Sequence, residues 1–335
     1  MDSVSQFALG AAVGVAVMSR RTAIWKAALW GGIAGTLPDL DAFIDHGDAV
    51  SSMVFHRAAS HGLFWLTLGA PLLGWVVARV HGEGALGQRW ALAMGLALVT
   101  HPLLDTMTVY GTQLLQPFSA YPYAVGSIFI IDPLYTLPLL VGLAIALARP
   151  AWRGLRANAW GLGLSVAYLA WSAAAQWHVQ AVVQASLAAG GAPSARVLVT
   201  PAPLNTVLWR VVVMREDGYE EGFYSLLDPE PRVRFERFAS DAGLYRTLQD
   251  LPAVRRIAAF SHGFYKVHEQ GGEVYITDLR MGQEPGYVFS FRVARREGAR
   301  WVPVTAANAG ARPDLDRGLP WLWARLRGQD VPSPR

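Results

Sequence analysis

Histidines and aspartates recur in short, closely spaced pairs in the first half of this chain. In "HPLLD", His101 and Asp105 are four residues apart, which places both side chains on one face of a helix. In "HRAASH", His56 and His61 are five residues apart, so they share a site if His56 lies in a loop and His61 begins the next helix. Imidazole and carboxylate groups are ligands that Zn²⁺, Mn²⁺ and Fe²⁺ accept.

Two further acidic segments extend this pattern. "TLPDLD" places Asp39 and Asp41 just after a proline, where an extended backbone would point both carboxylates the same way. Asp132, in "FIIDPLY", is an acid within an apolar run. We therefore expect one or two divalent ions, with Zn²⁺ favoured over Mn²⁺ or Fe²⁺, held by a set of seven residues. The predicted ligands are Asp39, Asp41, His56, His61, His101, Asp105 and Asp132.

A metal-activated water would need a proton acceptor and a group that stabilises negative charge. A carboxylate not used as a ligand, or a free histidine, would accept the proton. We predict catalytic roles for Asp41 and for Arg57, beside the histidines; Arg57 could instead form an ion pair with a cluster aspartate. Several polar residues could support the site or line a cleft, or could be loop caps and interfacial side chains. They are Asp2, Gln6, Tyr110, Gln113, Ser119 and His178.

The composition divides the chain into two parts. Residues 1–200 contain 10 Lys/Arg and 8 Asp/Glu, whereas residues 201–335 contain 19 and 17, a composition normal for a water-facing domain. There is no cysteine, so disulfides and thiolate metal sites are excluded. The basic residues do not cluster on one segment, which gives no nucleic-acid signal.

The first part predicts an α-helical membrane bundle of about six spans. A bundle tolerates the prolines within these runs because neighbouring helices and water satisfy the freed backbone groups. The expected spans cover residues 4–19, 23–43, 62–80, 88–108, 127–148 and 157–184.

The loops between these spans differ in charge. The loops with Arg20, Arg79 and Arg149 are basic, whereas the alternate loops contain only Arg57. By the positive-inside rule the basic loops are cytoplasmic. The aspartates and histidines then converge on the outer face, with the N-terminus and the C-terminal domain also extracytoplasmic.

Beyond the spans we expect a small α+β domain with an antiparallel sheet, because strand-like runs such as "TVLWRVVVMRE" and "EVYITDLRM" alternate apolar and polar residues. The predicted organisation is a transmembrane helical domain over 1–185, a linker over 186–200, the soluble domain over 201–328 and a frayed tail over 329–335.

Five motifs, in this order, resemble the YdjM-type family of membrane-bound, metal-dependent hydrolases. They are "PDLD", "HRAASHG", "HPLLDTMTVYGTQLLQPFS", "IIDPLY" and, beyond the main match over about residues 1–140, "PAPLNTVLWRVV". One departure is Gly62, which stands where the family's histidine motif usually has serine. The resemblance implies hydrolase activity and the bacterial inner membrane, and it names no substrate.

The sequence thus predicts a metal-dependent hydrolase acting on a phosphoester or ester of a lipid or envelope component, with membrane lipids as partners. The alternatives are a cation or proton-coupled transporter, whose intramembrane acids and histidines would bind or relay ions, and a non-enzymatic membrane scaffold. Against the transporter, the polar residues gather at one face and no inverted repeat is visible.

Overall fold

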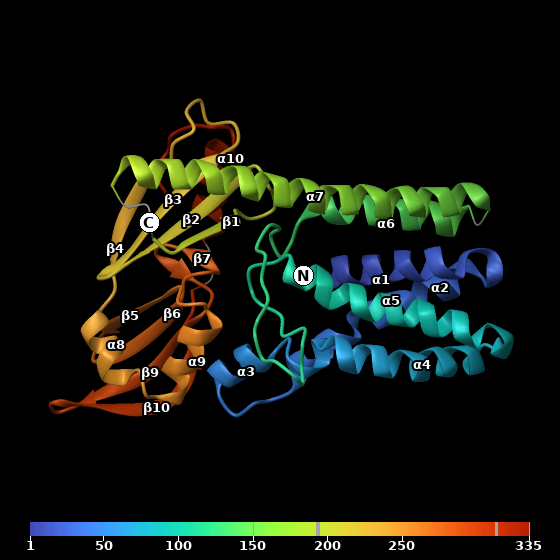
Figure 1. Ribbon diagram of the computed structural model, residues 1–335, viewed down its shortest axis with the longest axis horizontal. Coiled ribbons are helices and arrows are strands. Elements are labelled where there is room, and N and C mark those ends of the chain that lie inside the picture. The colour runs from blue at the N-terminus through green and yellow to red at the C-terminus, as the bar shows by residue number, and fades with distance from the viewer. Residues whose placement is uncertain (150, 192–194, 312–313, 335) are drawn as a thin grey trace. The chain divides into compact units, whose positions relative to one another are not determined.

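The computed structural model describes residues 1–149, 151–191, 195–311 and 314–334 (Figure 1). It divides the chain into two compact units. The helical unit comprises Met1–Ile44, His56–Ala173 and Pro203–Asn205. The sheet unit comprises Asp45–Phe55, Ala174–Ala202 and Thr206–Arg335. Of the predicted linker, residues 192–194 lie outside the described residues.

The helical unit is built from antiparallel helices that pack side by side (Figure 1). Its α-helices are α1 (Ser3–Met18), α2 (Ile24–Thr36), α4 (Leu63–Val80), α5 (Gly87–Thr106), α6 (Pro133–Ala148) and the first part of α7 (Trp152–Ala189). Short 3₁₀ helices connect them: η1 (Ser19–Arg21), η2 (Leu37–Phe43), η3 (Ala59–His61) and η4 (Gly84–Leu86).

Local sequence explains where these helices begin and end. Asp2 caps α1 by accepting hydrogen bonds from the backbone N–H groups of Val4 and Ser5. Asp132 caps α6 in the same way, with Pro133 in the first turn, where its missing N–H costs nothing. At the end of α2, the Leu37–Pro38 step gives way to a 3₁₀ helix that carries Asp39 and Asp41.

Glycines allow α1 and α2 to approach closely. A β-carbon on Gly31 would meet the backbone oxygen of Gly10, and one on Gly35 would lie 2.6 Å from the backbone oxygen of Gln6. This contact brings the end of α2 against the first turns of α1, which in turn packs on α5. The core beneath it contains the fully buried side chains of Met18 and Trp90.

The prediction of a six-span bundle is wrong. Within the described residues, one helix, α4, is long and apolar enough to cross a membrane. α1, α2 and α6 have 16, 13 and 16 residues, which is short of the roughly 20 that a bilayer core requires. α5 and α7 are longer but more polar. The apolar stretches of the sequence continue past the residues at which helices end. The predicted span over 23–43, for example, is divided between α2 and η2.

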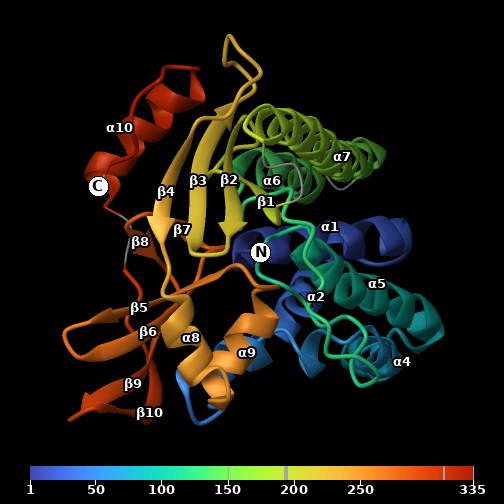
Figure 2. The same cartoon turned by 60° about the vertical axis from the view of Figure 1, so that its left-hand side comes forward.

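The sheet unit agrees with the expected antiparallel architecture. One four-stranded sheet has the order β1-β2-β3-β4 and the other β10-β9-β6-β5, with β7 and β8 as a short ribbon; Figure 2 shows the first sheet. The strands are β1 (Val197–Pro201), β2 (Leu208–Arg215), β3 (Gly218–Ser225), β4 (Phe235–Ala239), β5 (Tyr265–Gln270), β6 (Glu273–Asp278), β7 (Gly282–Gln283), β8 (Gly286–Tyr287), β9 (Ser290–Glu297) and β10 (Arg300–Asn308).

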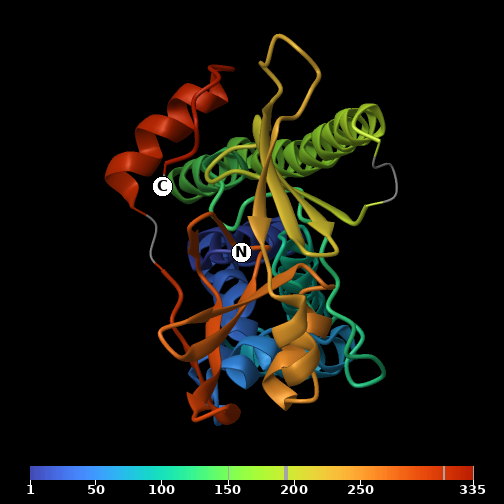
Figure 3. The ribbon, with the colours of Figure 1, turned by 90° about the vertical axis from the view of Figure 1, so that its left-hand side faces the viewer.

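Both faces of the first sheet are covered, which explains why β2 is apolar almost throughout. Val211 and Val213 pack with Val179 and Val183 of α7, whereas Val212 joins a cluster on the opposite face. The remaining helices of this unit are α3 (Ala49–Phe55), α8 (Ala242–Leu248), α9 (Pro252–Phe260) and α10 (Leu315–Leu326). α10 (red in Figure 3) lies beside the first sheet. Its Trp321 side chain packs in a buried cluster with Leu208 of β2.

The glycine contact between α1 and α2 predicts a strong sensitivity to side-chain size. Gly31→Val should lower the free energy of unfolding by about 1–3 kcal/mol, because the added carbons meet backbone atoms that cannot rotate away. The thermal melting temperature of detergent-purified protein measures this loss. Gly69→Ala in α4 is the matched control, since nothing lies within 4 Å of its β-carbon position. Equal melting temperatures for Gly31→Val and wild type would contradict this packing.

Candidate metal centre

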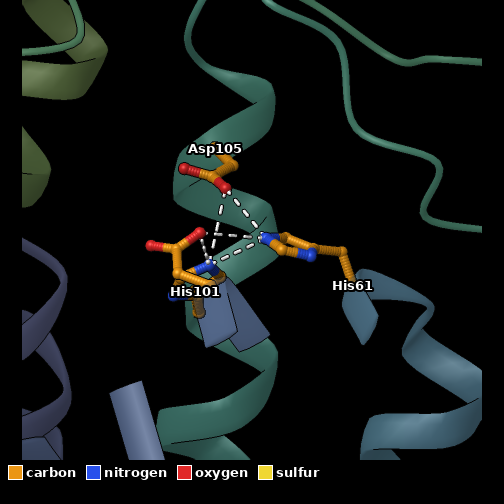
Figure 4. A group of neighbouring side chains, drawn as sticks. His61, His101 and Asp105 are labelled. Atoms are coloured by element: carbon orange, nitrogen blue, oxygen red, sulfur yellow. Dashed lines mark hydrogen bonds and ion pairs between the residues drawn. The ribbon is translucent and has the colours of Figure 1, made fainter. Parts of the chain in front are cut away.

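Four side chains from three elements of the helical unit converge on one point. η2 contributes Asp39, η3 contributes His61, and α5 contributes both His101 and Asp105. Figure 4 shows His61, His101 and Asp105 turned toward one another. α5 continues as a helix through Pro102, so the i, i+4 spacing holds and both of its side chains face the same way. His61, His101 and Asp105 are fully buried, and the Asp39 side chain is 21% exposed.

The donor atoms are spaced as ligands of one ion. The two imidazole Nε2 atoms are 3.0 Å apart. Each lies 3.4 Å from Asp39 Oδ1, and Asp105 Oδ2 lies 3.3 Å from His61 and 3.5 Å from His101. Four ligands about 2.1 Å from a tetrahedral Zn²⁺ would lie about 3.4 Å from one another. The buried cluster could therefore hold a metal ion.

Hydrogen bonds at the Nδ1 atoms of His61 and His101 orient both rings, so that the lone pair of each Nε2 points toward the centre of the cluster. His101 Nδ1 lies 2.6 Å from the backbone oxygen of Gly35, which can only accept a hydrogen bond, so Nδ1 carries the proton. The Ser60 hydroxyl donates to Asp41, so it accepts from His61 Nδ1 at 2.9 Å. Histidine ligands of metals are oriented by such partners. Without a cation or an added proton, these lone pairs would face each other and two carboxylates.

The Asp105 carboxylate also indicates that the cluster requires a positive charge. Its Oδ1 accepts a hydrogen bond from Gln6 Nε2 at 2.9 Å and pairs with the α-amino group of Met1. Its Oδ2 is buried and has no hydrogen-bond partner in the described part of the chain, although Arg57 Nε forms an ion pair with it at 3.1 Å. A buried carboxylate oxygen left in this state is costly, and a bound cation would satisfy it.

The electrostatics of the cluster favour a positive charge at its centre. Burial lowers the pKa of His61, but the carboxylates of Asp105, Asp39 and Asp41 outweigh burial and raise this pKa to about 9. Burial likewise raises the pKa of Asp39, but hydrogen bonds from His101 and His61 outweigh it and hold the pKa below its ordinary value. The carboxylates thus favour positive charge among the donor atoms, and a bound divalent ion would take the place of a proton on His61.

Asp41 and His56 form a pair beside the cluster instead of joining it. His56 Nδ1 lies 2.7 Å from Asp41 Oδ1, and the other carboxylate oxygen accepts from the Arg57 backbone N–H at 3.0 Å. Because the carboxylate accepts from Nδ1, the lone pair of His56 is on Nε2. The His56 side chain is 25% exposed.

Arg57 lies between this pair and the cluster. Its backbone has a positive φ of 63°, a conformation that costs energy in a residue other than glycine. The buried guanidinium contacts Asp105, lies 3.2 Å from Thr108 Oγ1 and is stacked 4.8 Å from the centre of the Tyr110 ring. The strained backbone thus allows one residue to contact Asp41 with its main chain and Asp105 with its side chain.

Other predicted site residues lie outside the four-residue cluster. Asp132 caps α6 and accepts a hydrogen bond from Tyr168 at 2.8 Å. Asp2 caps α1, and Ser119 accepts from the backbone N–H of Tyr121. His178 is exposed on α7 in the sheet unit.

Three of the supporting residues do lie near the centre. Gln6 contacts Asp105, Tyr110 contacts both Arg57 and His56, and the backbone N–H of Gln113 donates to the Arg57 carbonyl. The sequence reasoning missed Ser60 and the Gly35 carbonyl. The position of Ser60 between the two histidines of "HRAASH" could have indicated its role. A main-chain carbonyl such as that of Gly35 gives no indication in the sequence.

Gly62, the departure from the histidine motif, has a packing explanation. A β-carbon at this position would lie 2.9 Å from the backbone oxygen of Gln116. The loop after α5 thus approaches residue 62 closely, and a serine there would push it away. The polar partner of His61 is the preceding residue, Ser60.

The four-residue cluster predicts a stoichiometric metal site. Purified wild-type protein should bind about one divalent ion per chain, as a site of four protein ligands does, and Asp39→Ala and His101→Ala should lose most of it. Elemental analysis by mass spectrometry measures the content. His81→Ala is the control, because His81 pairs with Trp30 at the opposite end of the helices. Equal metal in wild type and His101→Ala would exclude the site.

Comparison with known proteins identifies a family for the chain. The model of the YdjM inner membrane protein family matches residues 1–179, which include all four residues of the cluster. No curated protein and no solved structure matches the chain. The match covers more than half of the sequence, so the chain belongs to the YdjM inner membrane protein family.

Proposed function

We propose that this protein is a membrane-bound hydrolase that depends on a divalent metal ion and acts on phosphoesters. The observation that supports this most strongly is the convergence of two imidazole nitrogens and two carboxylate oxygens on one point, with the buried Asp105 Oδ2 lacking a hydrogen bond. The mixed nitrogen and oxygen donors favour Zn²⁺, with Mn²⁺ or Fe²⁺ as alternatives. Such an ion supplies Lewis-acid polarisation and makes a bound water more acidic.

Proton transfer is assigned to the pair beside the cluster. His56 presents Nε2 as a base, and Asp41 orients the ring and stabilises its charged form through the 2.7 Å contact with Nδ1. His56 would take a proton from the attacking water and return it to the oxygen of the leaving group. This assignment separates the two histidines of "HRAASH": His61 holds the ion and His56 moves the proton.

Arg57 favours a phosphoester over a carboxylic ester. Its guanidinium is buried, held by Asp105, Thr108 and Tyr110, and adjacent to the donor atoms. A planar cation at this position can pair with phosphoryl oxygens as negative charge develops on them. A fixed cation costs little reorganisation during the reaction, which suits a transition state with charge spread over several oxygens.

The centre is proposed to face the outside of the inner membrane. It lies at the beginning of α4, the candidate span, whereas Arg79 lies at the end of that helix. Lys26, which pairs with Glu83 at 2.8 Å, and Arg89 lie at the same end as Arg79. The positive-inside rule places this basic end in the cytoplasm.

Replacing His56 should separate catalysis from metal binding. His56→Asn should lower kcat on a chromogenic phosphoester by roughly 10²–10⁴-fold, the usual contribution of a general acid–base group, while its metal content stays at the wild-type level. His101→Ala should lose activity and metal together. If His56→Asn lost its metal, His56 would be a ligand and the assignment would be wrong.

The proposed orientation can be tested because the chain has no cysteine. A membrane-impermeant maleimide should label Ser119→Cys from outside intact cells and should label Gly84→Cys only after the cells are permeabilised. Gly84 is exposed at the basic end, and Ser119 is partly exposed. The reverse labelling pattern would invert the proposed orientation.

A further inference from the structure

An exposed apolar surface, which we call the aromatic rim, borders the metal centre. It combines the first turn of α4 with the loop after α5, and its residues are between 42% and 78% exposed. It consists of Phe64, Trp65, Leu115, Phe118 and Tyr121.

Defined side-chain and backbone contacts hold the residues of the rim together. The Phe64 and Phe118 rings are in edge contact with their centres 5.4 Å apart, and the backbone N–H of Leu63 donates to the Leu114 carbonyl at 2.9 Å. An antiparallel bridge between Thr112 and Tyr123 closes the base of the loop. These contacts hold the most exposed ring, Phe118, at the loop tip.

The base of the same loop contacts the site. The backbone N–H of Gln113 donates to the Arg57 carbonyl at 2.9 Å, and Tyr110 packs on both Arg57 and His56. On the η2 side, Leu40 and Phe43 are exposed, whereas Asp39 and Asp41 of the same short helix face the cluster and the His56 pair. Apolar side chains thus flank the polar centre from two segments.

The bilayer is the occupant that fits the rim. Phe64 and Trp65 are the first turn of α4, so the rim is continuous with the candidate span. Residues 106–131, which include the whole loop, contain no Asp, Glu, Lys or Arg. Aromatic side chains are enriched where membrane spans meet water, and an uncharged apolar loop there gains free energy by leaving water.

Resting on the proposed function, we infer that the aromatic rim lies in the bilayer surface and that the substrate is a phosphoester lipid, which enters the metal centre from the membrane. The acyl chains stay in the bilayer against the rim, and the headgroup phosphate meets Arg57 and the donor cluster. Water oxygen forms the new bond to phosphorus as the phosphorus–oxygen ester bond breaks. His56 takes the water proton and passes it to the departing oxygen.

The test compares two substrates with full-length protein reconstituted into phosphatidylcholine vesicles. Phosphatidic acid in the vesicles reports on lipid hydrolysis, and p-nitrophenyl phosphate reports on the chemistry alone. Phe118→Ser and Trp65→Ser should lower kcat/KM for phosphatidic acid by about tenfold each, the cost of losing one apolar anchor, and leave the soluble substrate unaffected. Trp25→Ser is the control, because Trp25 is 53% exposed at the basic end.

A second measurement places the rim without relying on activity. A fluorophore on Phe118→Cys should be quenched by lipids labelled near the headgroup, because the rim is placed in the bilayer surface. Absence of quenching at position 118 overturns the rim placement. If the protein cleaves p-nitrophenyl phosphate but not phosphatidic acid, the substrate assignment alone is overturned. The same holds if the rim variants and Trp25→Ser lose equal activity on phosphatidic acid. If neither substrate is cleaved, the proposed function and its substrate fail together.

Discussion

The structure depends on one electrostatic constraint: four donor atoms are held closer together than they would remain without a positive charge among them. His61 and His101 each present an imidazole nitrogen, and Asp39 and Asp105 each present a carboxylate oxygen, with separations of 3.0–3.5 Å for the pairs that include a histidine. Surrounding contacts hold the four side chains in place, and the Met1 α-amino group and Arg57 offset part of the negative charge by pairing with Asp105. A cluster of this kind stabilises the fold only when positive charge balances its carboxylates. Folding and ion binding are therefore linked.

The packing of the helical unit positions the residues that hold the four donor side chains. The glycine contact between α1 and α2 positions two partners of the centre, Gln6 on one helix and the Gly35 carbonyl on the other. Larger side chains at Gly10 or Gly31 would separate these helices and displace both partners. The helix contact is therefore part of the site, because the Gly35 carbonyl orients the His101 ring and Gln6 holds the Asp105 carboxylate.

Two histidines that are close in sequence have different environments. His61 is fully buried with its inward nitrogen among carboxylates, whereas His56 is partly exposed and has Asp41 as its partner. The bend that separates them contains Arg57 with its positive φ. The roles we propose for His61 as ligand, His56 as base and Arg57 as cation thus depend on one strained turn, which lies next to the aromatic rim.

The sequence by itself predicted the residue types, the i, i+4 pair of His101 and Asp105, the family resemblance and the antiparallel sheets, because these depend on local spacing and alternation. It did not predict that Asp39 and Asp41 would serve different partners, since a 3₁₀ turn replaced the expected extended segment. It also failed on the six spans, because hydropathy does not show where a helix ends. Only the tertiary structure decided that Asp132 caps a helix away from the cluster and that Ser60 and the Gly35 carbonyl orient the imidazoles. The contact between His101 and the Gly35 carbonyl joins segments distant in the chain, and no local pattern encodes it. The Ser60 and Asp132 contacts are between residues close in sequence, but the fold selects them from several possible partners.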